Sequence, residues 1–160
     1  MKKSIYWILG LILIGYLSYY TAANYYSPYQ GKITKSDISG EWKCTRSSGF
    51  KNGQISINYN FNDNYTYKAI YNISVFGNKA TTYEIYTKGR YKILDNIIRT
   101  DVISMEFLKK GFGEQDQNYK LLHDAFDPNN KDIADYLILS LNKNNLVFTM
   151  DKTVKYTCSK

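Results

Sequence analysis

Histidine, cysteine and proline are scarce in this chain of 160 residues, which has one histidine, two cysteines and two prolines. The single His123 and two cysteines without short ligand spacing argue against a metal site. GxSxG, HExxH, P-loop and dinucleotide-binding motifs are also missing. With no nucleophile paired to a base, we predict that the protein is not an enzyme and uses neither a metal nor a cofactor.

Concentrated positive charge is missing as well. The formal net charge is +7, but Lys109-Lys110 is the only basic doublet outside the N-terminus, and no stripe of arginines and aromatics occurs. We therefore predict no nucleic-acid partner. Attraction to an anionic membrane surface or to an acidic partner stays open.

Charge is also absent from residues 4–23, which are rich in Ile, Leu and aromatics and follow Lys2 and Lys3. One interpretation is an uncleaved membrane anchor, since about 20 apolar residues span a bilayer. The other is a signal peptide cleaved after Thr21-Ala22-Ala23. In both cases residues 24 onward are exported. The favoured location is the inner membrane, single-pass, with the C-terminal domain in the periplasm.

The rest of the chain has room for one folded domain. Residues 24–36 contain Pro28 and Gly31 and lack periodicity, which is typical of a linker. Residues 37–160 are predicted to form a β-domain, interrupted by an insertion at about 108–132.

Strict alternation of apolar and polar residues over Gln54–Phe61 predicts a half-buried strand. A turn at Asn62-Asp63-Asn64 and a strand with Tyr65, Tyr67, Ala69, Tyr71 and Ile73 on one face complete a hairpin. Lys88-Gly89 is interpreted as a later turn. Counting a strand around Trp42, about eight or nine short strands follow one another, which favours an antiparallel up-and-down meander closed into a β-barrel. A β-sandwich is the alternative. The other predicted strands are Ala80–Thr87, Arg90–Leu94, Ile97–Phe107, Tyr136–Leu141, Leu146–Met150 and Thr153–Cys158.

Both cysteines lie near the ends of the exported domain. An even pair in an oxidising compartment predicts a Cys44–Cys158 disulfide. Closure of a barrel makes the first and last strands neighbours, so the disulfide and the barrel support one another. Two unpaired buried thiols are the alternative.

The insertion carries Tyr119, Leu122 and Phe126 at helical spacing within Glu114–Phe126, before Asp127-Pro128. Long insertions in compact domains are often functional, so these three residues and Phe112 are candidate partner-binding residues. The alternative is a lid that plugs one end of the barrel. His123, in the same helix, is interpreted as an ordinary surface or hydrogen-bonded histidine.

Tyrosine is abundant, with 17 copies. Each buried ring brings a hydroxyl that needs a partner, so these rings either fill the lumen or line a pocket for an amphipathic ligand. Our candidate ligand-binding residues are Tyr59, Tyr67, Tyr83 and Tyr91. Alternation places more tyrosines on inward faces, namely Tyr59, Tyr65, Tyr67, Tyr71, Tyr83, Tyr91, Tyr136 and Tyr156.

Gly40-Glu41-Trp42, at the start of this meander, resembles the G-x-W motif of the lipocalin-like (calycin) proteins over an architecture spanning residues 37–158. The resemblance implies that Trp42 packs across the closed end of the barrel under a late basic residue, for which Lys152 or Lys155 is available here in place of an arginine. Arg99-Thr100-Asp101 is only loosely similar to the middle motif of true lipocalins, and their C-terminal helix is missing.

Two functional hypotheses follow. In the first, a non-enzymatic, lipocalin-like binding module of the bacterial envelope holds a small amphipathic or lipidic ligand in a tyrosine-rich barrel. In the second, a membrane-anchored periplasmic immunity, inhibitor or accessory protein binds an envelope protein through the 108–132 insertion.

Overall fold

The computed structural model of the chain describes residues 28–46, 53–75, 80–112, 116–130, 134–150 and 154–160. Strands dominate these ranges, with two α-helices and one short 3-10 helix. In chain order the elements are α2 (Lys35–Ile38), β1 (Gly40–Arg46), β2 (Gly53–Phe61), β3 (Thr66–Val75), β4 (Thr81–Leu94), β5 (Ile97–Lys110), α3 (Gln117–Phe126), η1 (Pro128–Asn130), β6 (Ala134–Leu141), β7 (Asn145–Thr149) and β8 (Lys155–Ser159).

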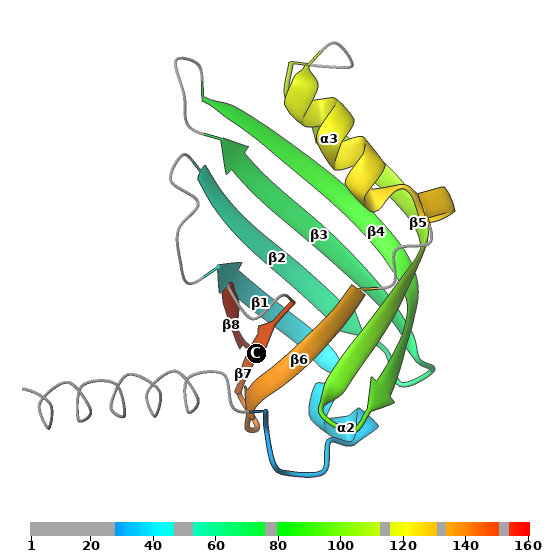
Figure 1. Ribbon diagram of the computed structural model, residues 1–160, viewed down its shortest axis with the longest axis vertical. Helices are drawn as coiled ribbons and strands as arrows, with labels where there is room; N and C mark the ends of the chain where they lie inside the picture. Colours follow the sequence, from blue (N-terminus) through cyan, green and yellow to red (C-terminus); the bar gives the residue numbers. More distant parts are fainter. Residues whose placement is uncertain (1–27, 47–52, 76–79, 113–115, 131–133, 151–153) are drawn as a thin grey trace, which may run out of the picture.

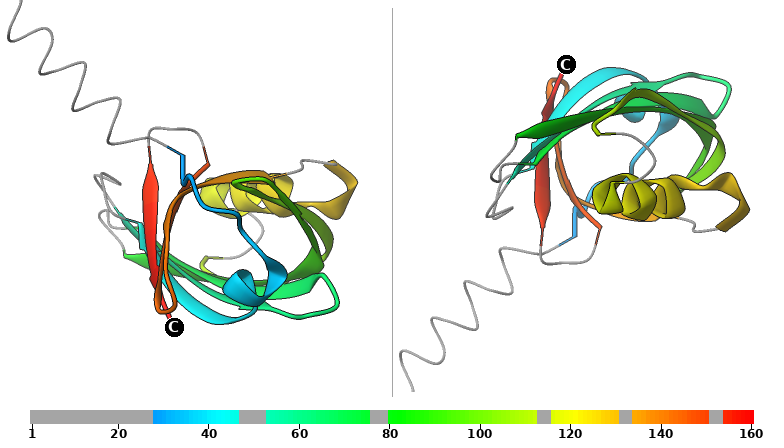
Figure 2. Two further views of the ribbon diagram at one scale, coloured as in Figure 1. Left: turned by 90° about the horizontal axis from the view of Figure 1, so that it is seen from below. Right: turned by 90° about the horizontal axis from the view of Figure 1, so that it is seen from above.

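The eight strands pair in chain order, and β8 returns to pair with β1, so the sheet closes into an antiparallel barrel (Figure 1). Figure 2, which views the molecule from below and from above, shows the strands running around a ring. The structure therefore confirms the predicted closed antiparallel β-barrel and excludes the β-sandwich. Closure also removes the unpaired sheet edges that an open meander would expose.

Alternation along the strands fills the lumen with aromatic rings. In β4, Thr81, Tyr83, Ile85 and Thr87 are buried, while the residues between them are partly exposed. Between the paired strands β7 and β8, Phe148 stacks on its register partner Tyr156 with ring centroids 5.1 Å apart. The core is thus built mainly from tyrosine, phenylalanine and isoleucine, as the period of two predicts.

The seam between β1 and β8 carries the disulfide. Cys44 and Cys158 are direct antiparallel partners with Cα atoms 3.9 Å apart, and their sulfur atoms are bonded. This confirms the predicted pairing and links strands at opposite ends of the domain sequence.

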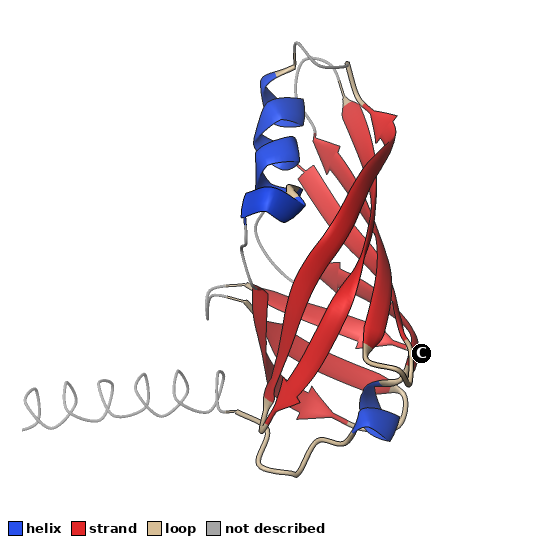
Figure 3. Ribbon diagram, turned by 90° about the vertical axis from the view of Figure 1, so that its right-hand side faces the viewer, coloured by secondary structure: helices blue, strands red, loops and turns tan. Residues whose placement is uncertain are grey.

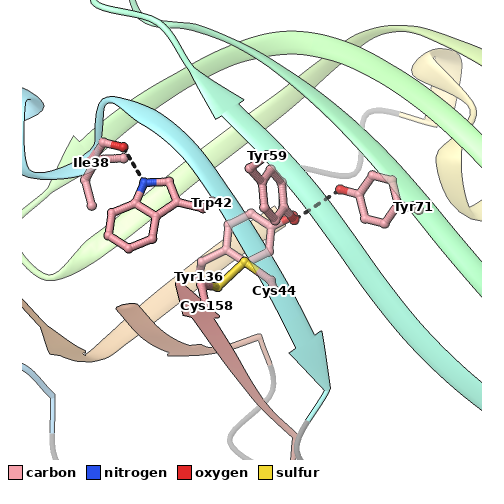
Figure 4. Close-up of a disulfide and its surroundings, with 7 residues drawn as sticks. All are labelled: Ile38, Trp42, Cys44, Tyr59, Tyr71, Tyr136 and Cys158. Carbon is pink, nitrogen blue, oxygen red and sulfur yellow. Dashed lines mark hydrogen bonds between the residues drawn. A yellow bond between two sulfur atoms is a disulfide. The ribbon is translucent and has the colours of Figure 1, made fainter. Parts of the chain in front are cut away.

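The end of the barrel next to α2 is closed by Trp42 (Figure 4). Trp42 is 0% exposed, and its indole nitrogen donates a 2.7 Å hydrogen bond to the carbonyl oxygen of Ile38 in α2. A cation does lie over the ring, but it is the ammonium of Lys160, 4.6 Å from the ring centroid. Of the two lysines considered from the sequence, Lys155 is not this cation, and Lys152 lies outside the described residues.

The opposite end is open because the strands differ in length. Strands β2 to β5 have 9 to 14 residues, whereas β6, β7 and β8 have 5 to 8. β5 pairs with β6 only over Ile97–Thr100 and then continues to Lys110. Helix α3 lies alongside this extension, over the side where the short strands have ended (Figure 3).

The expected turn at Lys88-Gly89 is wrong, because β4 runs without interruption through these residues. Gly89 serves a close approach between strands. A Cβ atom there would lie 2.0 Å from the carbonyl oxygen of Asp101, at a register shift between β4 and β5. Only glycine tolerates such contact.

Two smaller expectations also differ. Tyr65 belongs to the turn before β3, with φ of 62° and half of its surface exposed, so it does not share the inward face of Tyr67. Helix α3 begins at Gln117, after the N-cap residue Asp116, and ends at Phe126 as predicted.

None of the helices within the described ranges has the length and apolar character needed to cross a bilayer. The predicted signal or anchor at residues 1–23 lies outside those ranges.

Candidate functional site

A cavity of about 440 Å³ lies in the open half of the barrel, between the strands and α3. Its volume falls within the ordinary range for small-molecule sites. The walls are aliphatic and aromatic, with a few hydroxyl groups. The lining residues come from five strands, α3 and the segment after β7, and they are Ile55, Ile57, Tyr67, Tyr71, Ile73, Thr100, Val102, Leu122, Ala125, Phe126, Ala134, Tyr136, Met150 and Tyr156.

Helix α3 covers the cavity with one face. The Phe126 ring packs edge-on against Tyr71 with centroids 4.6 Å apart, and Tyr119 packs on Phe107 of β5 at 4.5 Å. Leu122, between these two residues, lines the cavity. The helix therefore acts as a wall of the site.

The start of α3 is tied to β4 by a buried tyrosine. The carboxylate of Asp116 caps the helix by accepting a 3.0 Å hydrogen bond from the backbone nitrogen of Asn118, and it also accepts the hydroxyl proton of Tyr83. Burial, followed by this hydrogen bond, raises the pKa of Tyr83 to about 12. Tyr83 is thus a neutral donor that holds the helix in place.

The floor of the cavity is a tyrosine trio, which we define as Tyr59, Tyr71 and Tyr136. The hydroxyl of Tyr59 donates to that of Tyr136 at 3.2 Å, and the hydroxyls of Tyr59 and Tyr71 share a second bond of 3.2 Å (Figure 4). Tyr71 and Tyr136 line the cavity, whereas Tyr59 lies behind them. The trio places polar groups at the base of an otherwise apolar site.

Burial raises the pKa of Tyr59, Tyr67 and Tyr71 well above the ordinary tyrosine value of 10.0. Repulsion from the neighbouring Tyr136 acts in the same direction on all three. These phenols therefore stay protonated at neutral pH and present hydroxyl groups, not phenolates.

These raised pKa values predict alkaline destabilisation. Above pH about 10, tyrosines in the unfolded chain lose their protons, while Tyr59 and Tyr71 keep theirs in the folded barrel. The folded state then binds more protons, so the free energy of unfolding falls as pH rises, by about 1.4 kcal/mol per pH unit for each such tyrosine. Urea unfolding from pH 8 to 11 measures this slope. A constant free energy of unfolding up to pH 11 would contradict the protonated interior.

The four candidate ligand-binding tyrosines lie in different places. Tyr67 lines the cavity and Tyr59 forms its floor from behind. Tyr83 bonds α3, and the hydroxyl of Tyr91 donates to the carbonyl of Asn62, 2.9 Å away at the α2 end. The cavity is also lined by three other tyrosines that alternation predicts to face inward, namely Tyr71, Tyr136 and Tyr156.

The four candidate partner-binding residues lie on two different surfaces. Tyr119, Leu122 and Phe126 face the barrel, through the contacts given above. Phe112 is 63% exposed, and Leu121, on the outer face of α3, is 61% exposed. The exposed apolar surface around α3 therefore includes Phe112 and Leu121, and neither residue belongs to the helically spaced set Tyr119, Leu122 and Phe126.

A shallow groove of about 660 Å³ lies near the α2 end, between residues 29–35 and the β4–β5 turn, and is open to solvent. Across the residues described, no group of three or more His, Cys, Asp or Glu side chains is placed to hold a metal ion.

Comparisons with known proteins identify one similar solved structure and no family. No protein-family model matches the chain, and no curated protein matches it. Among solved structures, the chain is similar to a lipocalin-like protein from Bacteroides uniformis, with 16% sequence identity and a TM-score of 0.43. The match covers 78% of this chain and 98% of that one.

Proposed function

We propose that this protein is a non-enzymatic binding module that holds a small amphipathic ligand in the cavity between the lumen and α3. The observation that carries the proposal is the cavity itself, with aliphatic walls, a covering helix and a floor of hydroxyl groups. Apolar walls bury the ligand's tail, while a few placed polar groups orient its head. Ile55, Ile73 and Leu122 would contact the tail.

Filling the cavity tests this proposal. Ala134, at the start of β6, lines the cavity next to Thr100. We expect Ala134→Phe to weaken binding of a neutral naphthylamine dye, whose fluorescence rises in apolar surroundings, at least about tenfold, because the new ring occupies the ligand's space. The titration uses the full chain in lipid nanodiscs, with empty nanodiscs as the blank.

The matched control is Ala80→Phe, which places the same ring at an exposed position before β4, outside the cavity lining. Thermal unfolding of both variants verifies that they are folded. Equal dye affinity of Ala134→Phe and the unmodified protein would rule out this cavity as the binding site.

A second hypothesis is binding of an envelope protein through the insertion. It is favoured by the exposure of Phe112 and Leu121, since large apolar side chains on a surface often mark interaction sites. The dye titration separates the two hypotheses, because a role confined to this outer surface requires no open cavity.

A further inference from the structure

The described part of the chain begins at the closed end of the barrel. The backbone nitrogen of Tyr29 donates a 2.8 Å hydrogen bond to the carbonyl oxygen of Ile138 in β6. Farther along the same segment, Ile33 and Ile38 are buried in the core. The segment is therefore fixed across the closed end, whereas α3 lies at the opposite end (Figure 1).

The predicted membrane segment, residues 4–23, ends five positions before Pro28. A fully extended chain advances at most about 3.6 Å per residue, so Pro28 lies within about 18 Å of Ala23. An anchor in residues 4–23 would therefore keep the closed end close to a bilayer. Such a tether still allows the barrel to stand upright or to lie on its side, and the charge of its surface then decides between these orientations.

Charge is distributed unevenly along the barrel. The closed half, with ten Lys or Arg and six Asp or Glu, is defined as residues 28–44, 60–68, 88–101, 135–145 and 158–160. The other residues from 24 onward contain nine Lys or Arg and eight Asp or Glu, and the insertion at 108–132 has four lysines and five acids. The positive excess therefore belongs mainly to the closed half.

Much of this excess lies on the outer face of β3 and β4. Alternation along β4 places three exposed cations there, namely Lys88, Arg90 and Lys92. Lys88 is the register partner of Lys68 in β3, and the next residues in this row, Asn60 and Ser104, are uncharged. Like charges directly opposite each other destabilise a sheet, so a negative surface outside the barrel would stabilise this pair.

Exposed apolar side chains and two more lysines lie next to these cations. Tyr65 is 50% exposed and Leu94 is 41% exposed. The ammonium of Lys35 lies 5.4 Å from the centroid of the Tyr65 ring, and Lys32 is exposed in the same segment. Lysines beside interfacial aromatic and aliphatic side chains are typical of surfaces that bind anionic bilayers. We define the basic sector as Lys32, Lys35, Tyr65, Lys68, Lys88, Arg90, Lys92 and Leu94.

We propose that residues 4–23 anchor the protein in a bilayer and that the basic sector docks the closed half of the barrel on anionic lipid head groups. Weak contacts suffice, because the tether holds the surface at a high effective concentration next to the bilayer. In this orientation the ligand cavity and α3 face away from the membrane. The inference goes beyond the proposed ligand and does not depend on it, since it concerns the opposite end of the barrel.

Paramagnetic relaxation measures which surface docks. The full chain is placed in phosphatidylcholine nanodiscs with about 30% phosphatidylglycerol, and a trace of gadolinium-chelating lipid broadens the amide NMR signals of residues near the bilayer. We expect the strongest broadening at Lys32, Tyr65 and Leu94 and little at Phe112 and Leu121. The contrast should largely disappear in pure phosphatidylcholine, and also in about 1 M salt, where the Debye length is only about 3 Å.

A pair of charge-matched variants tests the lysines. Lys32→Gln combined with Lys92→Gln removes two exposed charges of the basic sector. Each lysine at an anionic membrane surface contributes about fivefold, so we expect the ratio of docked to undocked protein to fall about 25-fold. The matched control is Lys109→Gln with Lys110→Gln, which removes two exposed charges at the far end of β5 and should leave the ratio unchanged.

Three results would overturn the proposal. Strongest broadening at Phe112 and Leu121 would show that the open end faces the bilayer. Equal broadening with and without phosphatidylglycerol would show that the basic sector does not bind anionic lipid and would leave it to an acidic protein partner. Failure of the full chain to insert into nanodiscs would remove both the anchor and the docking surface, while the proposed ligand function would stand.

Discussion

Replacing Cys44 and Cys158 together by alanine is expected to lower the free energy of unfolding by about 4–5 kcal/mol. The disulfide joins residues separated by 114 positions, and a loop of this length strongly restricts the unfolded chain in the chain-entropy model. Both residues are buried, and alanine at each site leaves no unpaired polar group. Urea unfolding followed by circular dichroism measures the difference.

Reduction of the unmodified protein provides the matched comparison. Adding a reductant should lower its free energy of unfolding by a similar amount and should leave the double alanine variant unchanged. The β1–β8 seam depends on the bond because only four residue pairs join these strands, from Lys43–Ser159 to Arg46–Tyr156. A loss below about 1 kcal/mol in both experiments would show that the seam is stable without the cross-link.

Trp42→Ala is expected to destabilise the fold by about 3–5 kcal/mol, as large-to-small substitutions of buried aromatics do. The variant loses a fully buried ring, and it also loses the 2.7 Å hydrogen bond to the Ile38 carbonyl that holds α2 on the barrel. The free energy from urea unfolding is the readout. Because the ligand cavity lies at the other end, the folded fraction should still bind the dye.

The variant Lys160→Ala removes the cation that covers the Trp42 ring and leaves the ring itself in place. The ammonium lies 4.6 Å from the Trp42 ring centroid, and a cation over a ring at an exposed site contributes only about 0.5–1 kcal/mol. We therefore expect a small loss for Lys160→Ala and a large loss for Trp42→Ala. Losses of similar size would mean that Trp42 does not close the barrel end through its own packing.

The barrel could be predicted from the sequence because its strands and turns are determined by short, local residue patterns. Alternation in Gln54–Phe61 and the turn at residues 62–64 set one hairpin, and repetition of this pattern favoured a closed meander. The cysteine pair then indicated which strands meet. The predicted turn at Gly89 is wrong because the sequence does not distinguish a glycine required by a turn from one required by a close contact. Gly89 is required by its close contact with the Asp101 carbonyl.

The sequence does not show which of the inward-facing residues line the cavity. Alternation tells whether a side chain faces the lumen, but not how far along the barrel axis it lies. Tyr91 and Tyr71 both face inward, yet Tyr91 bonds Asn62 at the closed end and Tyr71 contacts Phe126 under α3. Depth depends on strand register and length, including the early end of β6 to β8, and these are properties of the whole sheet.

The most direct test of the account is a crystal structure of the full chain with ω-bromooctanol, using the anomalous signal of bromine to locate the tail. The account predicts a bromine peak in the cavity beneath α3, near Ile55, Ile73 and Leu122. A bromine peak confined to the groove near α2, or an empty cavity at saturating ligand, would contradict it.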